Sequence, residues 1–131
     1  MANPNIINVT SILGTTTYLT PSVATAVVLL PNTAASGTVF KINQIVCSNT
    51  TASAVNATVS IYTNGAVAQG SAPSGGTAFP VISTISVPSS ASVIAVDKTT
   101  AIYLMEGTSI SVTSGTASGI TYTISYEVIA S

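Results

Sequence analysis

The sequence predicts an all-β domain, built as an antiparallel sandwich or barrel of roughly eight to ten short strands. Apolar and hydroxyl-bearing residues alternate in several segments with a period of two, which is the side-chain period of a β-strand. Turn-forming residues separate these segments at short intervals, and no apolar pattern of helical period reaches a convincing length. The 131 residues suit one domain with its own core.

The clearest strand covers residues 120–129, where apolar side chains occupy every second position from Ile120 to Val128. Residues 109–113 alternate in the same way, and a flexible Ser/Gly/Thr segment separates the two. We therefore expect an antiparallel hairpin that closes one sheet, with Tyr122 and Tyr126 supplying bulk to the core.

Residues 1–14 are predicted to form a strand or an extended arm that precedes a single β-sandwich domain of residues 15–131. Their apolar side chains fall on both alternation phases, as in a strand buried on both faces or an arm that packs on a neighbouring molecule. Near the other terminus, an isoleucine lies on the polar phase of the last strand. The residues expected at a partner interface are Ile6, Ile7, Val9, Ile12, Leu13 and Ile129.

The first half contains three further strand patterns. Residues 15–19 predict a short strand, and residues 23–30, apolar on both phases, predict a strand covered on both sides and stopped by Pro31. Residues 38–47 alternate but change phase at Asn43-Gln44, so a β-bulge is expected there.

The remaining segments complete the predicted sheets. Residues 55–62 alternate cleanly, and the Gly/Ser/Ala segment 66–77 has too little side-chain volume to pack, so we expect it to be exposed and mobile. Residues 81–87 and 92–96 are expected to pair with each other, and residues 102–105 form a short strand.

The composition is unusual in charge. Only 4% of the residues are charged, against about 25% in a typical soluble domain, and the net charge is −1. Copies of such a chain repel one another weakly, which suits a protein packed against identical copies or a larger particle. The alternative is a free monomer made soluble by its hydroxyl groups.

Two classes of partner are disfavoured. Two lysines cannot neutralise a nucleic-acid backbone, so no nucleic-acid partner is expected. The longest dense apolar run is far shorter than the roughly 20 residues that span a bilayer, and no secretory signal is visible at the N-terminus. We expect no membrane segment.

No residue combination indicates a reaction, so we expect a protein that is not an enzyme and that binds no metal, cofactor or small-molecule substrate. The sequence has no histidine to activate a nucleophile, and the single cysteine, Cys47, is expected to be a small buried side chain. The acids Asp97, Glu106 and Glu127 are expected at the surface.

Two features relate to carbohydrate. Tyr62 lies on the outward phase of its strand and is the one tyrosine that we would test as a sugar-binding residue. The acceptor pattern for N-glycosylation occurs at Asn8, Asn49 and Asn56, but without a secretory signal, in a chain rich in Asn and Thr, we read these matches as coincidence.

Four segments of the second half carry a resemblance: TISVP (84–88), SVIAVDK (92–98), IYLMEGTSISVT (102–113) and ISYEVI (124–129). Together they resemble small structural proteins of tailed-bacteriophage virions. The family commonly has a second acid at the turn where this chain has Met105 and Thr108. The resemblance rests on strands and turns, so no catalytic residue can be carried over.

The resemblance implies a β-sandwich of jelly-roll type on the virion surface, acting as a capsid cement or decoration protein. Such a protein would bind the outside of the shell as a homotrimer, across joints between major capsid proteins, and would stabilise their contacts. The alternative function is a carbohydrate- or receptor-binding module associated with a tail or fibre.

Overall fold

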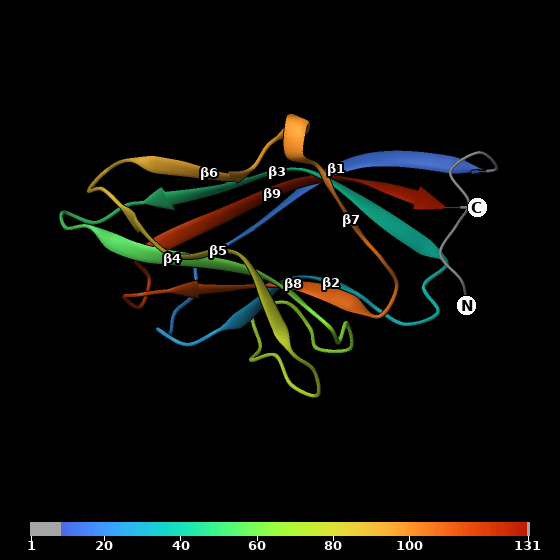
Figure 1. Cartoon of the computed structure of the whole chain (residues 1–131), viewed down its shortest axis with the longest axis horizontal. Coiled ribbons are helices and arrows are strands. Elements are labelled where there is room, and N and C mark those ends of the chain that lie inside the picture. Colours follow the sequence, from blue (N-terminus) through green and yellow to red (C-terminus); the bar gives the residue numbers. More distant parts are fainter. Residues whose placement is uncertain (1–8, 131) are drawn as a thin grey trace.

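The structure, a computed structural model, describes residues 9–130, which form a two-layer β-sandwich (Figure 1). The predicted all-β fold is confirmed, and the nine strands of this part of the chain lie within the predicted number. A short 3₁₀ turn, η2 (Lys98–Thr100), lies between the sixth and seventh strands. The strands are β1 (Ser11–Leu19), β2 (Val27–Asn32), β3 (Thr38–Asn49), β4 (Val55–Tyr62), β5 (Ala78–Val87), β6 (Ser92–Val96), β7 (Ile102–Leu104), β8 (Thr108–Ser114) and β9 (Ile120–Ala130).

The strand order is that of a jelly roll. Sheet A has the order β1-β9-β3-β6, with β7 also pairing with β3, and sheet B has the order β2-β8-β4-β5. In each sheet, an early strand of the chain pairs with a late strand (β1 with β9, β2 with β8), and the late strand also pairs with a strand from the middle, as in nested Greek keys. The jelly-roll type implied by the resemblance is confirmed by this order.

The last two strands do not form the predicted hairpin. β8 pairs with β2 and β4 in sheet B, whereas β9 pairs with β1 and β3 in sheet A. The connection crosses between the sheets, where the N–H of Gly115 donates to the Asn56 carbonyl (2.8 Å) and that of Ser118 to the Pro21 carbonyl (2.7 Å). The hairpin prediction failed because apolar and polar residues alternate in the same way in two strands that pair within one sheet and in two strands that face each other across a core.

The pairing predicted between residues 81–87 and 92–96 is wrong for the same reason. β5 pairs with β4, and β6 pairs with β3. A tight turn carries the chain from one sheet to the other: the N–H of Ala91 donates to the Pro88 carbonyl (3.2 Å), and Ser90 has a φ of 56°.

Several local predictions are confirmed, with shifted boundaries. The register between β3 and β9 shifts between Ile42 and Gln44, so the predicted bulge is present. Residues 27–30 are buried on both phases, but β2 starts at Val27 and continues through Pro31, which an edge strand tolerates. The expected boundary between residues 14 and 15 falls inside β1, so residues 11–14 belong to sheet A.

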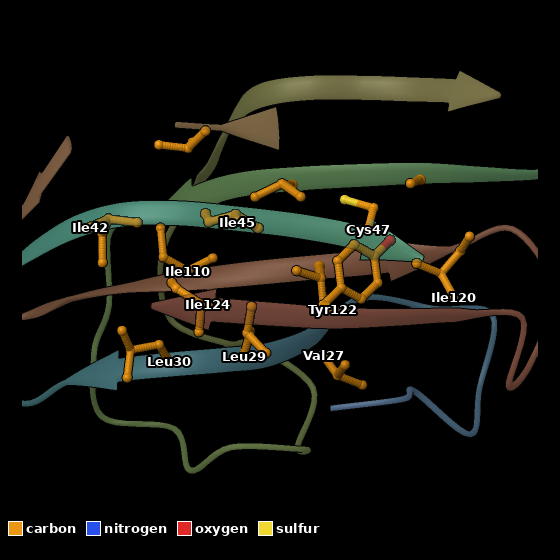
Figure 2. Packing of buried hydrophobic residues seen from close by; sticks show 14 of the residues in the cluster. Val27, Leu29, Leu30, Ile42, Ile45, Cys47, Ile110, Ile120, Tyr122 and Ile124 are labelled. Atoms are coloured by element: carbon orange, nitrogen blue, oxygen red, sulfur yellow. The ribbon is translucent and has the colours of Figure 1, made fainter. Parts of the chain in front are cut away.

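The core lies between the sheets and receives aliphatic side chains from both (Figure 2). Tyr122 of β9 is among its largest fully buried side chains, as predicted, and its hydroxyl donates to the Thr113 carbonyl of β8 at 2.5 Å. This bond links sheet A to sheet B. Burial raises the pKa of Tyr122 well above its usual value, so the hydroxyl remains a donor. Cys47 is buried beside it, as expected (Figure 2).

Two buried asparagines link the sheets at opposite ends of the sandwich. Asn32, at the end of β2, donates to the carbonyls of Thr38 (3.1 Å) and Leu104 (3.0 Å) in sheet A. Asn49, at the end of β3, donates to the Val87 carbonyl of β5 (2.9 Å) and to a loop carbonyl (2.8 Å). The Asn49 amide is therefore unavailable for glycosylation, in agreement with a coincidental acceptor pattern.

Residues 66–77 are mostly exposed, as expected, but the expectation that they do not pack is wrong, because part of this connection between β4 and β5 lies against sheet B. The N–H of Gly70 donates to the Val28 carbonyl (2.8 Å), and the N–H of Val28 donates to the Ser71 carbonyl (2.9 Å). At Gly65, an added Cβ would lie 2.1 Å from the Asn32 carbonyl oxygen.

Candidate functional site

The residues predicted for a partner interface lie in different environments. Ile6 and Ile7 are outside the described residues, and Val9 is half-exposed ahead of the first strand. Ile12 and Leu13 are exposed side chains of β1. Ile129 is the register partner of Ile12, but it is only 3% exposed, so it packs within the chain and does not share their exposure.

The structure places a broader candidate surface on the side of sheet A that faces away from the core, which we call the outer face. Cross-strand partners share a face of a sheet, so the register identifies its members. One row of register partners runs across the four strands β1, β9, β3 and β6. Its two end residues are exposed: Tyr18 on β1 is 71% exposed, and Ile94 on β6 is 56% exposed. The row consists of Tyr18, Thr123, Val46 and Ile94.

Hydroxyl groups occupy much of the remaining outer face. The Thr16 and Ser125 hydroxyls lie 3.0 Å apart, and those of Thr20 and Thr121 lie 2.8 Å apart, so each pair shares a hydrogen bond across β1 and β9. Such bonds fix the side chains and leave lone pairs free for further hydrogen bonds.

Charge on the outer face is sparse and locally balanced. Lys41 of β3 and Glu127 of β9 are direct register partners, and Tyr103 of β7 pairs with Lys41 in the same row. Tyr103 is 48% exposed. The face therefore combines exposed apolar side chains and hydroxyls with little net charge.

A pocket of about 390 Å³ lies where the β3 bulge meets η2, the turn that rises from sheet A on the side away from sheet B (Figure 1). The bulge brings Asn43 and Gln44 to the pocket, and within the described chain the Asn43 Oδ1 atom is buried without a hydrogen-bond partner. The lining residues are Asn43, Gln44, Asp97, Lys98 and Ser125.

Asp97 holds η2 in place as its N-cap. Its Oδ1 atom accepts hydrogen bonds from the Thr99 N–H (2.9 Å), the Thr99 hydroxyl (2.6 Å) and the Thr100 N–H (3.2 Å). These bonds, chiefly those from Thr99, lower the pKa of Asp97 below its usual value. Asp97 therefore lines the pocket as a carboxylate at neutral pH, beside Lys98.

The other reactive side chains lie apart from this pocket. Burial raises the pKa of the Cys47 thiol to about 12, so the thiolate nucleophile is suppressed. The Glu106 carboxylate accepts the Gly37 N–H (3.1 Å) near the end of β7. Within residues 9–130, no three His, Cys, Asp or Glu residues are grouped in a way that could hold a metal ion. The chemistry available at the outer face is hydrogen bonding and apolar contact.

Tyr62 is not an exposed binding residue. The preceding residue Ile61 packs against the core, so Tyr62 points to the opposite, outward face of β4, as predicted. However, the β4–β5 connection covers it: the hydroxyl donates to the Gly76 carbonyl and accepts from the Gly76 N–H, both at 3.0 Å. Tyr62 is consequently buried.

Tyr18, Ile94 and Tyr103 are exposed residues of the outer face that sequence reasoning did not select. Ile94 had a usable signal, because residues 93–96 are apolar on both phases and one phase must face outward. Tyr18 and Tyr103 join the same face only through the register of nonconsecutive strands.

Comparisons with known protein families, with curated proteins and with solved structures find no match, so function must be inferred from the outer face and its pocket. In the described part of the chain, no helix has the length and apolar character needed to cross a membrane.

Proposed function

We propose that this chain is a phage virion structural protein of the capsid cement or decoration type, which binds the outside of the shell and stabilises contacts between major capsid proteins. The observation that carries the proposal is the outer face of sheet A. It presents exposed apolar side chains among hydroxyl groups, with Lys41 and Glu127 as a balanced charge pair. The resemblance of the four segments 84–88, 92–98, 102–113 and 124–129 to virion proteins supports the same function.

The outer face would act as a docking plane. Ile94 and Tyr103 would lose exposed apolar area on contact, at about 25 cal/mol per Å². The hydroxyl groups would form hydrogen bonds to the shell, and the low charge would let copies crowd together with little repulsion. Binding to the assembled shell in preference to its separated subunits would stabilise the shell by mass action.

The test uses particles assembled from the same viral genome without this chain. Added chain is expected to bind them and to raise their temperature of rupture. The double variant Ile94→Ser/Tyr103→Ser is expected to bind about tenfold more weakly, because it removes two exposed apolar contacts. Bound chain is measured by co-sedimentation, and rupture is followed by release of the packaged DNA.

Phe79→Ser provides the matched control, because Phe79 is an equally exposed apolar residue of β5 in sheet B. It should leave binding unchanged. Equal loss of binding in both variants, or no binding of the unaltered chain, would rule out the outer face as the docking surface. Deletion of residues 1–14 is a poorer test, since it also removes the first four residues of β1.

The pocket supports a second candidate, a carbohydrate- or receptor-binding module. Amide and hydroxyl groups of Asn43, Gln44 and Ser125 converge there beside a carboxylate and an ammonium group. Such polar groups can fix the hydroxyls of a sugar.

This second candidate makes a separate prediction on a glycan array. Gln44→Ala/Ser125→Ala should abolish detectable binding, because both side chains line the pocket. Tyr62→Ala is the control, because Tyr62 lies beneath the β4–β5 connection and away from the pocket lining. The folded variant should bind the same glycans as the unaltered chain. Absence of glycan binding by the unaltered chain would remove this candidate.

A further inference from the structure

The four sheet edges of the described chain differ in their protection against pairing with another molecule. The edge of β2 is covered by residues 70–71, which exchange backbone hydrogen bonds with Val28. β5 contains Pro80, and its pairing with β4 shifts register twice. The far edge of sheet A is divided between the short strands β6 and β7. Cover, proline, irregular register and short strands all hinder edge-to-edge pairing.

β1 lacks these protections apart from one side-chain contact, in which Gln69 Nε2 of the β4–β5 connection donates to the Thr17 hydroxyl (3.1 Å). Its nine residues pair with nine consecutive residues of β9 without a register shift, and the strand contains neither a charged residue nor a proline. Within the described residues, no strand lies beside its other edge. Ile12 on the outer face and Leu13 on the core side are 58% and 64% exposed, so both of these β1 side chains are open to solvent, whereas Ile129 beside Ile12 is buried. A long, regular, uncharged edge is a ready template for another strand.

The β1 sequence is complementary to itself. In an antiparallel pair with a two-fold axis at Thr15, residue 12 lies opposite residue 18 of the second copy, and residue 11 lies opposite residue 19. Ile12 and Tyr18 share the outer face, so each exposed Ile12 would meet an exposed Tyr18, twice by symmetry. Pairs of β-branched and aromatic residues are favourable across strands. Moving the axis to Gly14 or Thr16 would leave one of these two residues opposite a position outside the strand.

We propose that the chain forms a two-fold dimer by antiparallel pairing of β1 with β1 of a second copy, which joins two A sheets into one continuous sheet. The net charge of −1 and the uncharged strand oppose this contact only weakly. A dimer of this kind differs from the trimer expected from the resemblance, and it does not depend on shell binding.

Sedimentation equilibrium of the full chain is expected to give a mass twice the 13.0 kDa of a single chain. The double variant Ile12→Lys/Tyr18→Lys places two lysines opposite each other at both ends of the pair and should be monomeric. Ile12→Lys/Tyr18→Glu places opposite charges there and should restore the dimer, with a dissociation constant that rises with salt. Ile94→Lys, which adds the same charge at the far edge of the face, should leave the dimer intact.

A mass of one or three chains for the unaltered protein would overturn the proposal. So would a dimer that survives the lysine pair, or one that the opposite-charge pair does not restore when both variants keep the unaltered circular dichroism spectrum. This assay uses free chain, so failure of the dimer proposal would not bear on shell binding, which the particle assay tests separately. Conversely, loss of shell binding in Ile94→Ser/Tyr103→Ser would leave the dimer in place.

Discussion

Tyr122→Ala is expected to lower the free energy of unfolding by about 3–5 kcal/mol, a large share of the roughly 5–15 kcal/mol that stabilises a domain. The phenol ring is fully buried between the sheets, so its removal leaves a cavity beside Cys47 (Figure 2). The variant also loses the hydrogen bond to the Thr113 carbonyl in sheet B. At about 4 °C per kcal/mol for a domain of this size, the melting temperature should fall by roughly 15 °C.

Tyr122→Phe separates the ring from the hydroxyl. It keeps the packing and removes the 2.5 Å hydrogen bond, so a loss of about 1–2 kcal/mol is expected. Tyr103→Phe makes the same chemical change at an exposed tyrosine and should change stability by less than about 0.5 kcal/mol. Urea unfolding followed by circular dichroism measures all three variants. Equal stability of Tyr122→Phe and the unaltered chain would contradict a stabilising link between the sheets.

The elements of the fold could be predicted because their signals are local. Alternation located most strands, and the phase change at Asn43-Gln44 located the bulge. Pairing could not be predicted in this way, because an apolar face toward the core is common to both sheets. The strand of residues 109–113 and that of residues 120–129 are close in sequence, yet they lie in opposite layers.

The candidate surface was less predictable than the fold. Ile12 and Leu13 were selected because their segment is apolar on both alternation phases, and both are exposed. Ile129 was selected as an apolar residue on the polar phase of the last strand, but it is buried at the end of β9. Tyr62 was assigned to the correct face, and only its cover by a distant part of the following loop was missed. Exposure depends on such nonlocal cover, which alternation does not encode.

Asn49→Ala is expected to cost about 2–4 kcal/mol, because the Asn49 amide joins both sheets and satisfies four hydrogen bonds in a buried position. Its Nδ2 atom donates to the carbonyls of Ser53 and Val87, and its Oδ1 atom accepts from the N–H and hydroxyl of Thr51. Asn56→Ala is the matched control, since Asn56 has an exposed side chain in β4, the next strand along the chain. Urea unfolding should place the control within about 0.5 kcal/mol of the unaltered chain.

Asn49→Asp should make this loss of stability depend on pH. We expect burial, and the Ser53 and Val87 carbonyls that face the lost donor, to raise the pKa of the introduced carboxyl above the value of about 3.9 found in an unfolded chain, by more than the Thr51 N–H and hydroxyl donors lower it. As pH rises from about 4, the unfolded chain loses its proton first, so the free energy of unfolding falls until the pH passes the folded pKa. The variant should therefore be closer to the unaltered chain at pH 4 than at pH 8, by more than about 1 kcal/mol. A stability difference that stays constant over this range would contradict a raised pKa at this site.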